Sequence, residues 1–301
     1  TGVAATGKHF VGHSVTEGGL NWAPAHLPPR ELREVHTLPF EMAIREADLA
    51  TVMNAYHEID GVPCGSSKEL LVDLLRHELG FAGAQVADYF TIENLESYHC
   101  VAHDRAEAAR LALEAGMDIE LPASVCYGEP LRQALDSGAV DIALVDAAVQ
   151  NVLRLKFRLG LFENPFVDAD AAMTVFDIPE QRALARRLAQ QSIVLLKNDG
   201  DLLPLDKAVG AIAVIGPCAD DMRLLQGDYH YPSHLEVMSV LAHADSALPT
   251  PGSAVPAPMS GDHNLSEYFV PMVTVLAGIK AAVAPSTEVR HARGCDINGT
   301  S

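Results

Sequence analysis

The chain of 301 residues lacks the features that mark several large classes of protein. No apolar run reaches the roughly 18 residues that a membrane-spanning helix requires. Basic residues are scarce, because 21 Lys and Arg stand against 40 Asp and Glu, and the formal net charge is −19. Nucleic acids and anionic membranes attract basic surfaces, so we expect neither as a partner.

Disulfide-rich, nucleotide-binding and serine-hydrolase signatures are missing as well. The five cysteines are scattered and form no Cys-x-x-Cys pair, which argues against a disulfide framework and a zinc site. Neither G-x-G-x-x-G nor the complete G-x-x-x-x-G-K-[ST] motif occurs, because His9 stands where the second motif needs Ser or Thr, so no glycine-rich phosphate turn is expected. The G-x-S-x-G turn of serine hydrolases is also absent.

Histidine is abundant, with 13 residues, and could suggest a metal site. Two pairs, His99 with His103 and His230 with His234, have the four-residue spacing that places both rings on one helix face. No carboxylate completes a H-E-x-x-H pattern at either pair. We therefore expect neither a metal nor another cofactor.

The first half of the chain alternates short apolar runs with helical patterns, which is typical of parallel β/α units. The expected strands are 2–6, 49–55, 84–87 and 117–121, with helices at 39–47, 66–79, 104–116, 130–135 and 142–159 and a loop at 60–63. Ser66 with Glu69, and Asp104 with Glu107, have capping-box spacing. Four such units in 163 residues predict part of a (β/α)₈ barrel, since a complete one needs ~250 residues. An open doubly wound sheet is the alternative.

A second unit is expected after a linker. Residues 164–180 contain two prolines and several aspartates and indicate that linker. Beyond it we expect a helix at 181–191, a buried strand at 211–215, a long loop at 229–265, a helix at 272–283 and a strand at 287–291.

Candidate chemical groups follow the predicted barrel strands. In parallel barrels the active site lies at the carboxyl ends of the strands. Those ends carry Lys8 with His9, Asn54 with Tyr56, Asp88, and Glu120. Such a rim suits a polyhydroxylated ligand, and a carboxylate there could attack an anomeric carbon. Equally, Asp88 could cap the next turn, and for Glu120 a structural ion pair is the favoured interpretation.

Several motifs, in order along the chain, resemble those of glycoside hydrolase family 3. They are residues 7–12 (GKHFVG), 29–32 (PREL), 38–40 (LPF), 52–63 (VMNAYHEIDGVP), 80–83 (GFAG), 86–89 (VADY), 115–122 (AGMDIELP), 155–162 (LKFRLGLF), 192–198 (SIVLLKN), 202–205 (LLPL) and 212–217 (IAVIGP). The resemblance covers nearly the whole chain apart from the stretch that follows Tyr229.

This resemblance implies a fold and an activity. The fold is α/β: the C-terminal half of a (β/α)₈ TIM-like barrel in residues 1–163, a linker at 164–180, and the start of an α/β/α sandwich in 181–301. The activity is that of a retaining, exo-acting β-glucosidase or β-xylosidase, with a small oligosaccharide or an aryl glycoside as substrate. Asp88 matches the catalytic nucleophile. The matching substrate-binding residues are Lys8, His9, Met53, Tyr56 and Tyr89.

The chain also departs from the family pattern. Ala87 stands where the family commonly has serine. The early barrel strands have no counterpart before Thr1, and the acid/base glutamate of the family comes later than the position of Ser301. We therefore expect a piece of a longer protein that is inactive on its own, and we assign no acid/base residue.

Two alternatives to this activity stay open. Residues 8–13 are similar to the Lys-His-Phe-Pro-Gly-His run of β-N-acetylglucosaminidases, although Val11 replaces the proline. The other alternative is a non-catalytic sugar-binding relative or a phosphorylase-like one.

Overall fold

A computed structural model describes residues 3–227, 230, 233 and 270–297. The chain divides into two units, residues 1–167 and 168–301. Almost all of the predicted loop at 229–265 lies outside the described residues.

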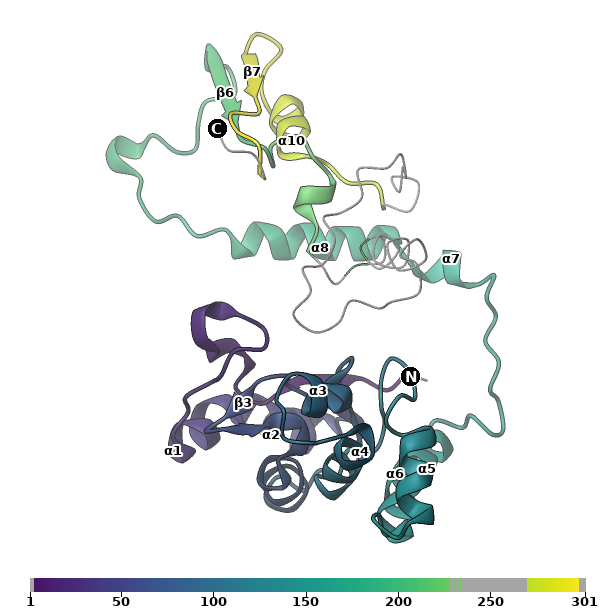
Figure 1. Ribbon diagram of the computed structural model, residues 1–301. Helices are drawn as coiled ribbons and strands as arrows, with labels where there is room; N and C mark the ends of the chain where they lie inside the picture. The colour runs from purple at the N-terminus through teal and green to yellow at the C-terminus, as the bar shows by residue number, and fades with distance from the viewer. Residues whose placement is uncertain (1–2, 228–229, 231–232, 234–269, 298–301) are drawn as a thin grey trace. The chain divides into compact units, whose positions relative to one another are not determined.

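A three-stranded parallel sheet forms the centre of the first unit, whose elements run from purple to teal in Figure 1. Its strands, in spatial order, are β1 (Thr6–Phe10), β2 (Thr51–Asn54) and β5 (Ala84–Val86). Thr51 is paired with Thr6 on one side and with Ala84 on the other. Parallel neighbours require crossover connections, and the chain makes each crossover through helices.

The first strand lies later in the chain than the sequence predicted. The apolar run at 2–6 was expected, but the strand is Thr6–Phe10, and Val3 is 85% exposed. Phe10 is fully buried, and the Thr6 hydroxyl bonds to that of Thr51, which fixes the strand in this register. His9 therefore lies within the strand and does not follow it.

The predicted fourth strand at 117–121 is reduced to a single parallel bridge between Val86 and Ile119. Around the bridge, Ala87 N–H donates to the Ile119 carbonyl over 2.8 Å and Ile119 N–H donates to Gln85 over 3.1 Å. The segment thus lies next to β5 and extends the sheet by one position.

Helices cover this sheet and connect its strands. They are α1 (Pro29–Glu31), η3 (Leu32–His36), α2 (Leu38–Ala47), η5 (Glu69–Glu78), α3 (Thr91–Ser97), α4 (Arg105–Glu114), α5 (Glu129–Asp136) and α6 (Ile142–Arg158), with single turns η1 (His13–Val15), η2 (Glu17–Gly19) and η4 (Cys64–Ser66). The Asp104 cap of α4 is confirmed, because its carboxylate accepts the Glu107 N–H over 2.8 Å. The Ser66 cap is wrong, because Ser67 accepts the Leu70 N–H and Ser66 bonds to Pro63.

The loop predicted at 60–63 forms the turn and the second strand of a small hairpin. Strands β3 (Glu58–Ile59) and β4 (Val62–Pro63) pair antiparallel around the two-residue turn Asp60-Gly61. Both turn residues have positive φ, 52° and 81°, which is what a tight hairpin of this kind requires.

One apolar core fills the first unit. Helix η5 contributes Leu70, Leu71, Leu74 and Leu75, all at most 5% exposed. The sheet contributes Phe10 and Val52, and α3 and α4 add further buried side chains: Ile92, Leu95, Ala108, Ala109, Ala112 and Leu113. The core therefore lies directly behind the strand ends that carry the candidate site.

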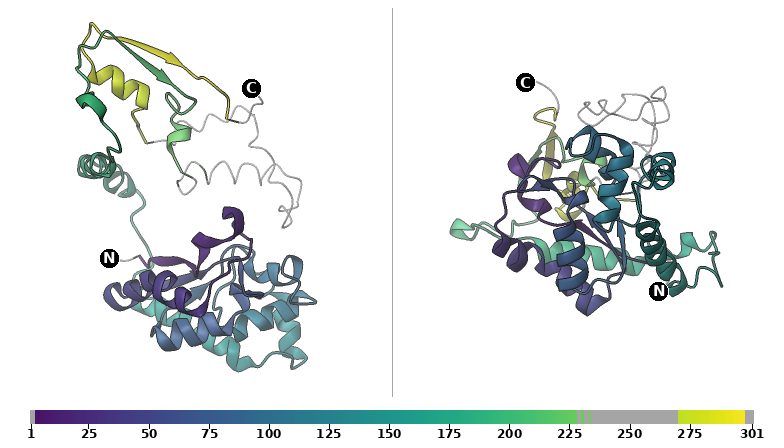
Figure 2. Two further views of the ribbon diagram at one scale, coloured as in Figure 1. Left: turned by 90° about the vertical axis from the view of Figure 1, so that its left-hand side faces the viewer. Right: turned by 60° about the horizontal axis from the view of Figure 1, so that its bottom comes forward.

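The second unit has a two-stranded parallel sheet, β6 (Ala211–Ile215) with β7 (Glu288–Ala292), and α10 (Val275–Ala282) lies against it (Figure 2). Strand β6 was expected to be buried, but only Val214 is, and Ile215 is 68% exposed. Since neighbouring strand residues face opposite sides, one helix covers only one face. The other elements in the described part of this unit are α7 (Ala172–Val175), α8 (Pro179–Ser192), η6 (Asp199–Asp201) and η7 (Arg223–Leu225).

Candidate active site

Asp88 lies two residues beyond β5, at the carboxyl end of the parallel sheet. It is only 9% exposed, and both carboxylate oxygens have partners. Oδ2 lies 3.1 Å from Nε2 of His9 on β1, and Oδ1 accepts the Tyr89 N–H over 2.8 Å. Two strands of the sheet thus bring an imidazole and a carboxylate together.

These contacts keep Asp88 ionised. Burial alone would raise the pKa of the carboxyl, but hydrogen bonds from the His9 side chain, the Tyr89 backbone and the Tyr56 side chain outweigh it. The net result is a pKa below the ordinary value of 3.8. At neutral pH the site therefore holds a carboxylate that can act as a nucleophile.

The backbone of Asp88 is held by a buried amide. Asn54, at the end of β2 and 1% exposed, accepts the Asp88 N–H at its Oδ1 over 3.1 Å and donates from Nδ2 to the Ala55 carbonyl over 2.7 Å. Sequence reasoning placed Asn54 at a strand end without this role. The signal that was available is an amide within an otherwise apolar strand.

Three imidazoles follow one another behind the carboxylate. The ring centroids of His9 and His13 are 4.6 Å apart, and those of His13 and His57 are 6.4 Å apart. Burial, and then the charge of His13, lowers the pKa of His57 to about 4. Burial also lowers the pKa of His13, and the nearby Lys8 ammonium acts in the same direction. At neutral pH the buried His57 is therefore uncharged.

Of the remaining predicted sugar-binding residues, Tyr56 and Tyr89 contact Asp88, whereas Met53 and Lys8 lie on the neighbouring strands. Tyr56 follows β2 by two residues and bonds to Asp88 through its side chain. Met53 is half-buried in β2, where it pairs in register with Val86. Tyr89 is 49% exposed next to the carboxylate, and Lys8 is exposed on β1.

An aromatic cluster that the sequence did not predict adjoins Tyr56. The ring of Trp22 lies 5.4 Å from that of Tyr56 and 5.1 Å from that of Tyr98, measured between centroids. Trp22 comes from the segment between η2 and α1, and Tyr98 follows α3. The chain has a single tryptophan, and its position within 20–27, a stretch without periodicity, gave no indication of this neighbour.

The remaining candidate carboxylate, Glu120, has a structural role. Its two oxygens accept the backbone N–H groups of Cys126 and Tyr127 over 2.8 and 2.7 Å. The neighbouring Asp118 bonds to Arg76 over 2.8 Å and to Asn151 over 2.9 Å. The structural interpretation of Glu120 fits these contacts, but the expected ion pair is wrong, because its printed partners are backbone N–H groups and not a basic side chain.

No group of three or more metal-ligating side chains occurs among the described residues. His99 bonds to the Tyr56 carbonyl over 2.9 Å, whereas His103 pairs with Glu107 and Asp104, so the two imidazoles have separate partners. The other pair includes His234, which lies outside the described residues. In the described part of the chain, no helix is long and apolar enough to span a membrane.

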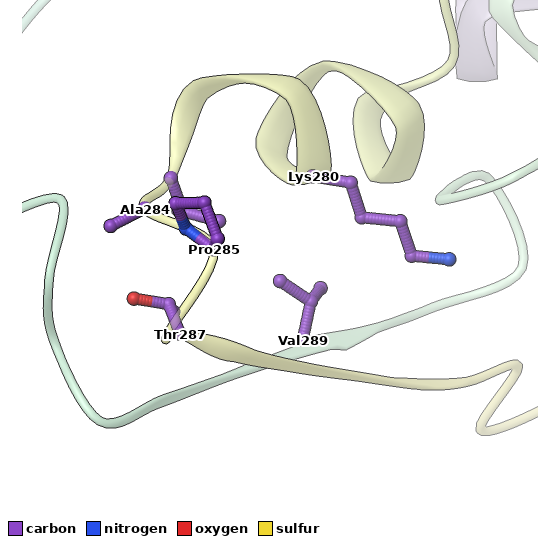
Figure 3. A pocket seen from close by; sticks show the side chains of 6 residues that line it. Lys280, Ala284, Pro285, Thr287 and Val289 are labelled. Carbon is purple, nitrogen blue, oxygen red and sulfur yellow. The ribbon is translucent and has the colours of Figure 1, made fainter.

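The second unit has an open pocket of about 360 Å³ between α10 and β7 (Figure 3). Its lining contains the aliphatic side chains of Val283 and Val289 and a single ammonium group, on Lys280. The Thr287 hydroxyl in this lining already donates to the Lys207 carbonyl over 2.8 Å. No carboxylate lines the pocket, so it offers none of the groups found at Asp88.

Comparison with known proteins agrees with this architecture. Residues 1–155 match the Glycosyl hydrolase family 3 N terminal domain, and residues 193–297 match the Glycosyl hydrolase family 3 C-terminal domain. A beta-xylosidase of Formosa agariphila is 34% identical over 99% of this chain and 38% of its own length.

Two solved structures extend the comparison. A β-glucosidase from Erythrobacter marinus is 34% identical with a TM-score of 0.76, covering 98% of this chain and 34% of that one. A β-glucosidase from Listeria innocua, solved in complex with gluconolactone, is 28% identical with a TM-score of 0.76 over 96% of this chain and 34% of that one. The chain thus spans little more than a third of its relatives' length. With both domains matched in order, it belongs to glycosyl hydrolase family 3.

Proposed function

We propose that this chain carries the nucleophile of a retaining, exo-acting β-glycosidase, a β-glucosidase or β-xylosidase. Its substrate is a small β-linked oligosaccharide or an aryl glycoside, cleaved at the terminal non-reducing sugar. The observation that carries the proposal is the ionised, nearly enclosed carboxylate of Asp88, held between His9 and the Tyr89 N–H at a parallel strand end.

The chemistry proceeds in two displacements. An oxygen of Asp88 attacks the anomeric carbon, and the bond from that carbon to the leaving oxygen breaks. The leaving oxygen keeps the electron pair and takes a proton from a general acid. Water then attacks the same carbon, gives its proton to the conjugate base and releases Asp88.

The environment of Asp88 supports the role of nucleophile. A general acid must hold a proton at the working pH, whereas the pKa of Asp88 is lowered, so the group is ionised there. The acid/base group is not assigned to any residue of this chain.

Five side chains around Asp88 are proposed to bind the terminal sugar. Lys8 would hold a sugar hydroxyl through its ammonium group, because an ionised donor makes a hydrogen bond about twice as strong as a neutral one. His9 would bind a second hydroxyl through its imidazole. Met53, Tyr56 and Tyr89 would contact the ring. Support comes from the contacts of His9 and Tyr56 with Asp88 and from the exposure of Tyr89 beside it.

The same proposal covers the fold of the complete enzyme. Strands β1, β2 and β5, with the bridge at Ile119, are proposed to be four neighbouring strands of a (β/α)₈ barrel in residues 1–163. Residues 164–180 would be the linker, and 181–301 the start of an α/β/α sandwich. The meeting of site residues at the carboxyl ends of the strands supports the barrel.

A mechanism-based label tests the nucleophile directly. We expect 2,4-dinitrophenyl 2-deoxy-2-fluoro-β-glucoside to release one equivalent of dinitrophenolate and to leave the fluoro-sugar on the peptide that contains Asp88. Dinitrophenolate departs without protonation, so the test does not depend on the general acid. The xyloside analogue, run in parallel, compares the two candidate sugars.

Matched variants define the outcome. Asp88→Asn should not be labelled, while Asp136→Asn, which removes an exposed carboxylate of α5, should react like the parent chain. Labelling at Glu120 or at any other carboxylate would overturn the assignment. Sugar binding without labelling would favour the non-catalytic alternative.

A further inference from the structure

Two aromatic rings form a platform one ring away from Asp88. Trp22 packs against Tyr56 at 5.4 Å and against Tyr98 at 5.1 Å between centroids. Tyr56 in turn bonds to Asp88 through its side chain. Asp88, Tyr56 and the aromatic platform, defined as Trp22 with Tyr98, are therefore consecutive neighbours.

The platform is accessible, unlike an aromatic residue with a purely structural role. Tyr98 is 42% exposed and Trp22 is partly exposed. Tyr127 of the same unit shows the structural alternative, since it packs against the apolar core and its hydroxyl donates to the Met117 carbonyl over 2.8 Å. Large aromatic surface left accessible beside a site is typical of ligand contact.

The platform is also held in place before any ligand arrives. The Tyr98 hydroxyl donates to the Trp22 carbonyl over 3.2 Å, which joins the two ring-bearing segments. The segment that carries Trp22 is tied further by Ala25 N–H, which donates to the Glu58 carbonyl over 3.0 Å. Rings that are already ordered lose little conformational entropy when they bind.

We propose that Trp22 and Tyr98 bind the ring next to the sugar held at Asp88, which is the first ring of the leaving group. This inference rests on the function proposed above and adds a substrate preference to it. The ligand chemistry is a ring with an apolar face, supplied either by a second β-linked pyranose or by an aryl group. Both present a flat surface that can stack on an indole.

The single tryptophan makes the test direct, because all indole emission comes from Trp22. The parent chain is titrated with glucose, with thiocellobiose and with phenyl 1-thio-β-glucoside, whose thio linkages resist cleavage. We expect both two-ring ligands to shift the emission saturably and to bind roughly 3- to 10-fold more tightly than glucose, the range that one aromatic contact provides. Comparing the two distinguishes the pyranose from the aryl source.

Three variants that keep the reporter sharpen the test. Tyr98→Ala should bring the affinity for the two-ring ligands to within about 2-fold of that for glucose. Tyr98→Phe keeps the ring and loses only the bond to Trp22, so it should retain most of the preference. Phe162→Ala is the matched control, since it removes one ring of another exposed pair, 4.4 Å from Phe157, and should change nothing.

The results that would overturn the platform are distinct from those that would overturn the function. If glucose alone shifts the emission fully and a second ring adds no affinity, the chain binds a sugar and the platform is wrong. The same holds if Tyr98→Ala folds and keeps the preference for two rings. If calorimetry finds no sugar binding and Asp88 is not labelled, the proposed function fails and the platform with it.

Discussion

The two units of the chain differ in what they bury. The first unit encloses a sheet, several helices and a set of polar groups: Asn54, His57, Gln85, Asp88 and Asn94 are all at most 9% exposed. In the described part of the second unit, the apolar core comprises Val214, Ala219 and Leu276, and the buried polar side chains are the hydroxyls of Ser233 and Thr287. Among the described residues, the core of the first unit alone is large enough to hold ionisable groups away from water.

This difference explains why the candidate site lies in the first unit. An enclosed carboxylate needs donors at fixed positions, and fixed positions need packed elements behind them. In the first unit, η5 and the sheet supply that packing, and β1 and β2 supply His9 and Asn54. In the second unit, apolar residues 193–196 are between 62% and 92% exposed, so that segment has no comparable support.

The largest effect expected from this comparison is on stability. Leu75→Ala removes a fully enclosed side chain of the first unit and should lower its free energy of unfolding by about 2–5 kcal/mol. Leu196→Ala removes a side chain that is 92% exposed and should change stability by less than about 0.5 kcal/mol. Urea unfolding followed by circular dichroism measures both, and Trp22 emission reports on the first unit alone. If Leu196→Ala lowers the free energy of unfolding as much as Leu75→Ala does, the contrast between the two units is wrong.

The same contrast decides how much of the fold could be predicted. The helices of the first unit follow from apolar periodicity, and the expected helix at 142–159 is α6, Ile142–Arg158. The sequence did not show as clearly which side chain bonds to a given backbone group. Ser67 in place of Ser66 caps η5, and a tight Asp60-Gly61 turn makes the predicted loop at 60–63 part of a hairpin. The burial of β6 was overestimated, because an apolar run does not show how many elements will cover it.

The site was predictable only in part. The motifs indicated the candidate residues, and the structure brings His9, Tyr56 and Tyr89 into contact with Asp88. Their partners come from positions far apart in sequence, as with Asn54 and Asp88, and no local pattern records such a pair. The expected inactivity of residues 1–301 alone stays a prediction.

A second test uses the pH dependence of stability. His57 is fully enclosed, and its pKa of about 4 lies below the ordinary 6.5. Below pH 6.5, His57 is therefore protonated in the unfolded chain but still neutral in the folded one. The stability that is present above that pH is lost as the pH falls toward 4. The shift corresponds to about 3 kcal/mol. Urea unfolding from pH 7 to 4 measures the slope.

Two histidine variants separate the units in this experiment. His57→Gln should flatten the slope between pH 6.5 and 4, leaving the contributions of His13 and His99, whose pKa values burial lowers in the same direction. Asp88 contributes only at lower pH, because its pKa lies below 3.8. His291→Gln changes an exposed residue of β7 and should leave the slope as it is. A His57→Gln variant with the parent slope would contradict the enclosed, neutral imidazole.

The smallest expected effect is on two asparagines, each of which bonds through its side chain to two backbone groups. Asn54 accepts the Asp88 N–H inside the first unit, whereas Asn198 bonds to both the N–H and the carbonyl of Leu203 at the surface of the second, over 2.8 and 2.9 Å. Asn54→Ala leaves the buried Asp88 N–H without its acceptor and should lower the free energy of unfolding by about 1–3 kcal/mol. Asn198→Ala should lower the free energy of unfolding by less than about 0.5 kcal/mol, because water replaces the lost partner.

The labelling rate of Asp88 adds a readout that stability alone does not move. Without Asn54, the backbone that aims the carboxylate loses its anchor, so the fluoro-sugar should react more slowly even where Asn54→Ala is fully folded. Asn198→Ala should react at the parent rate. If Asn54→Ala loses stability but labels at the parent rate, then His9 and the Tyr89 N–H suffice to aim the carboxylate, and the buried amide serves the fold of the first unit alone.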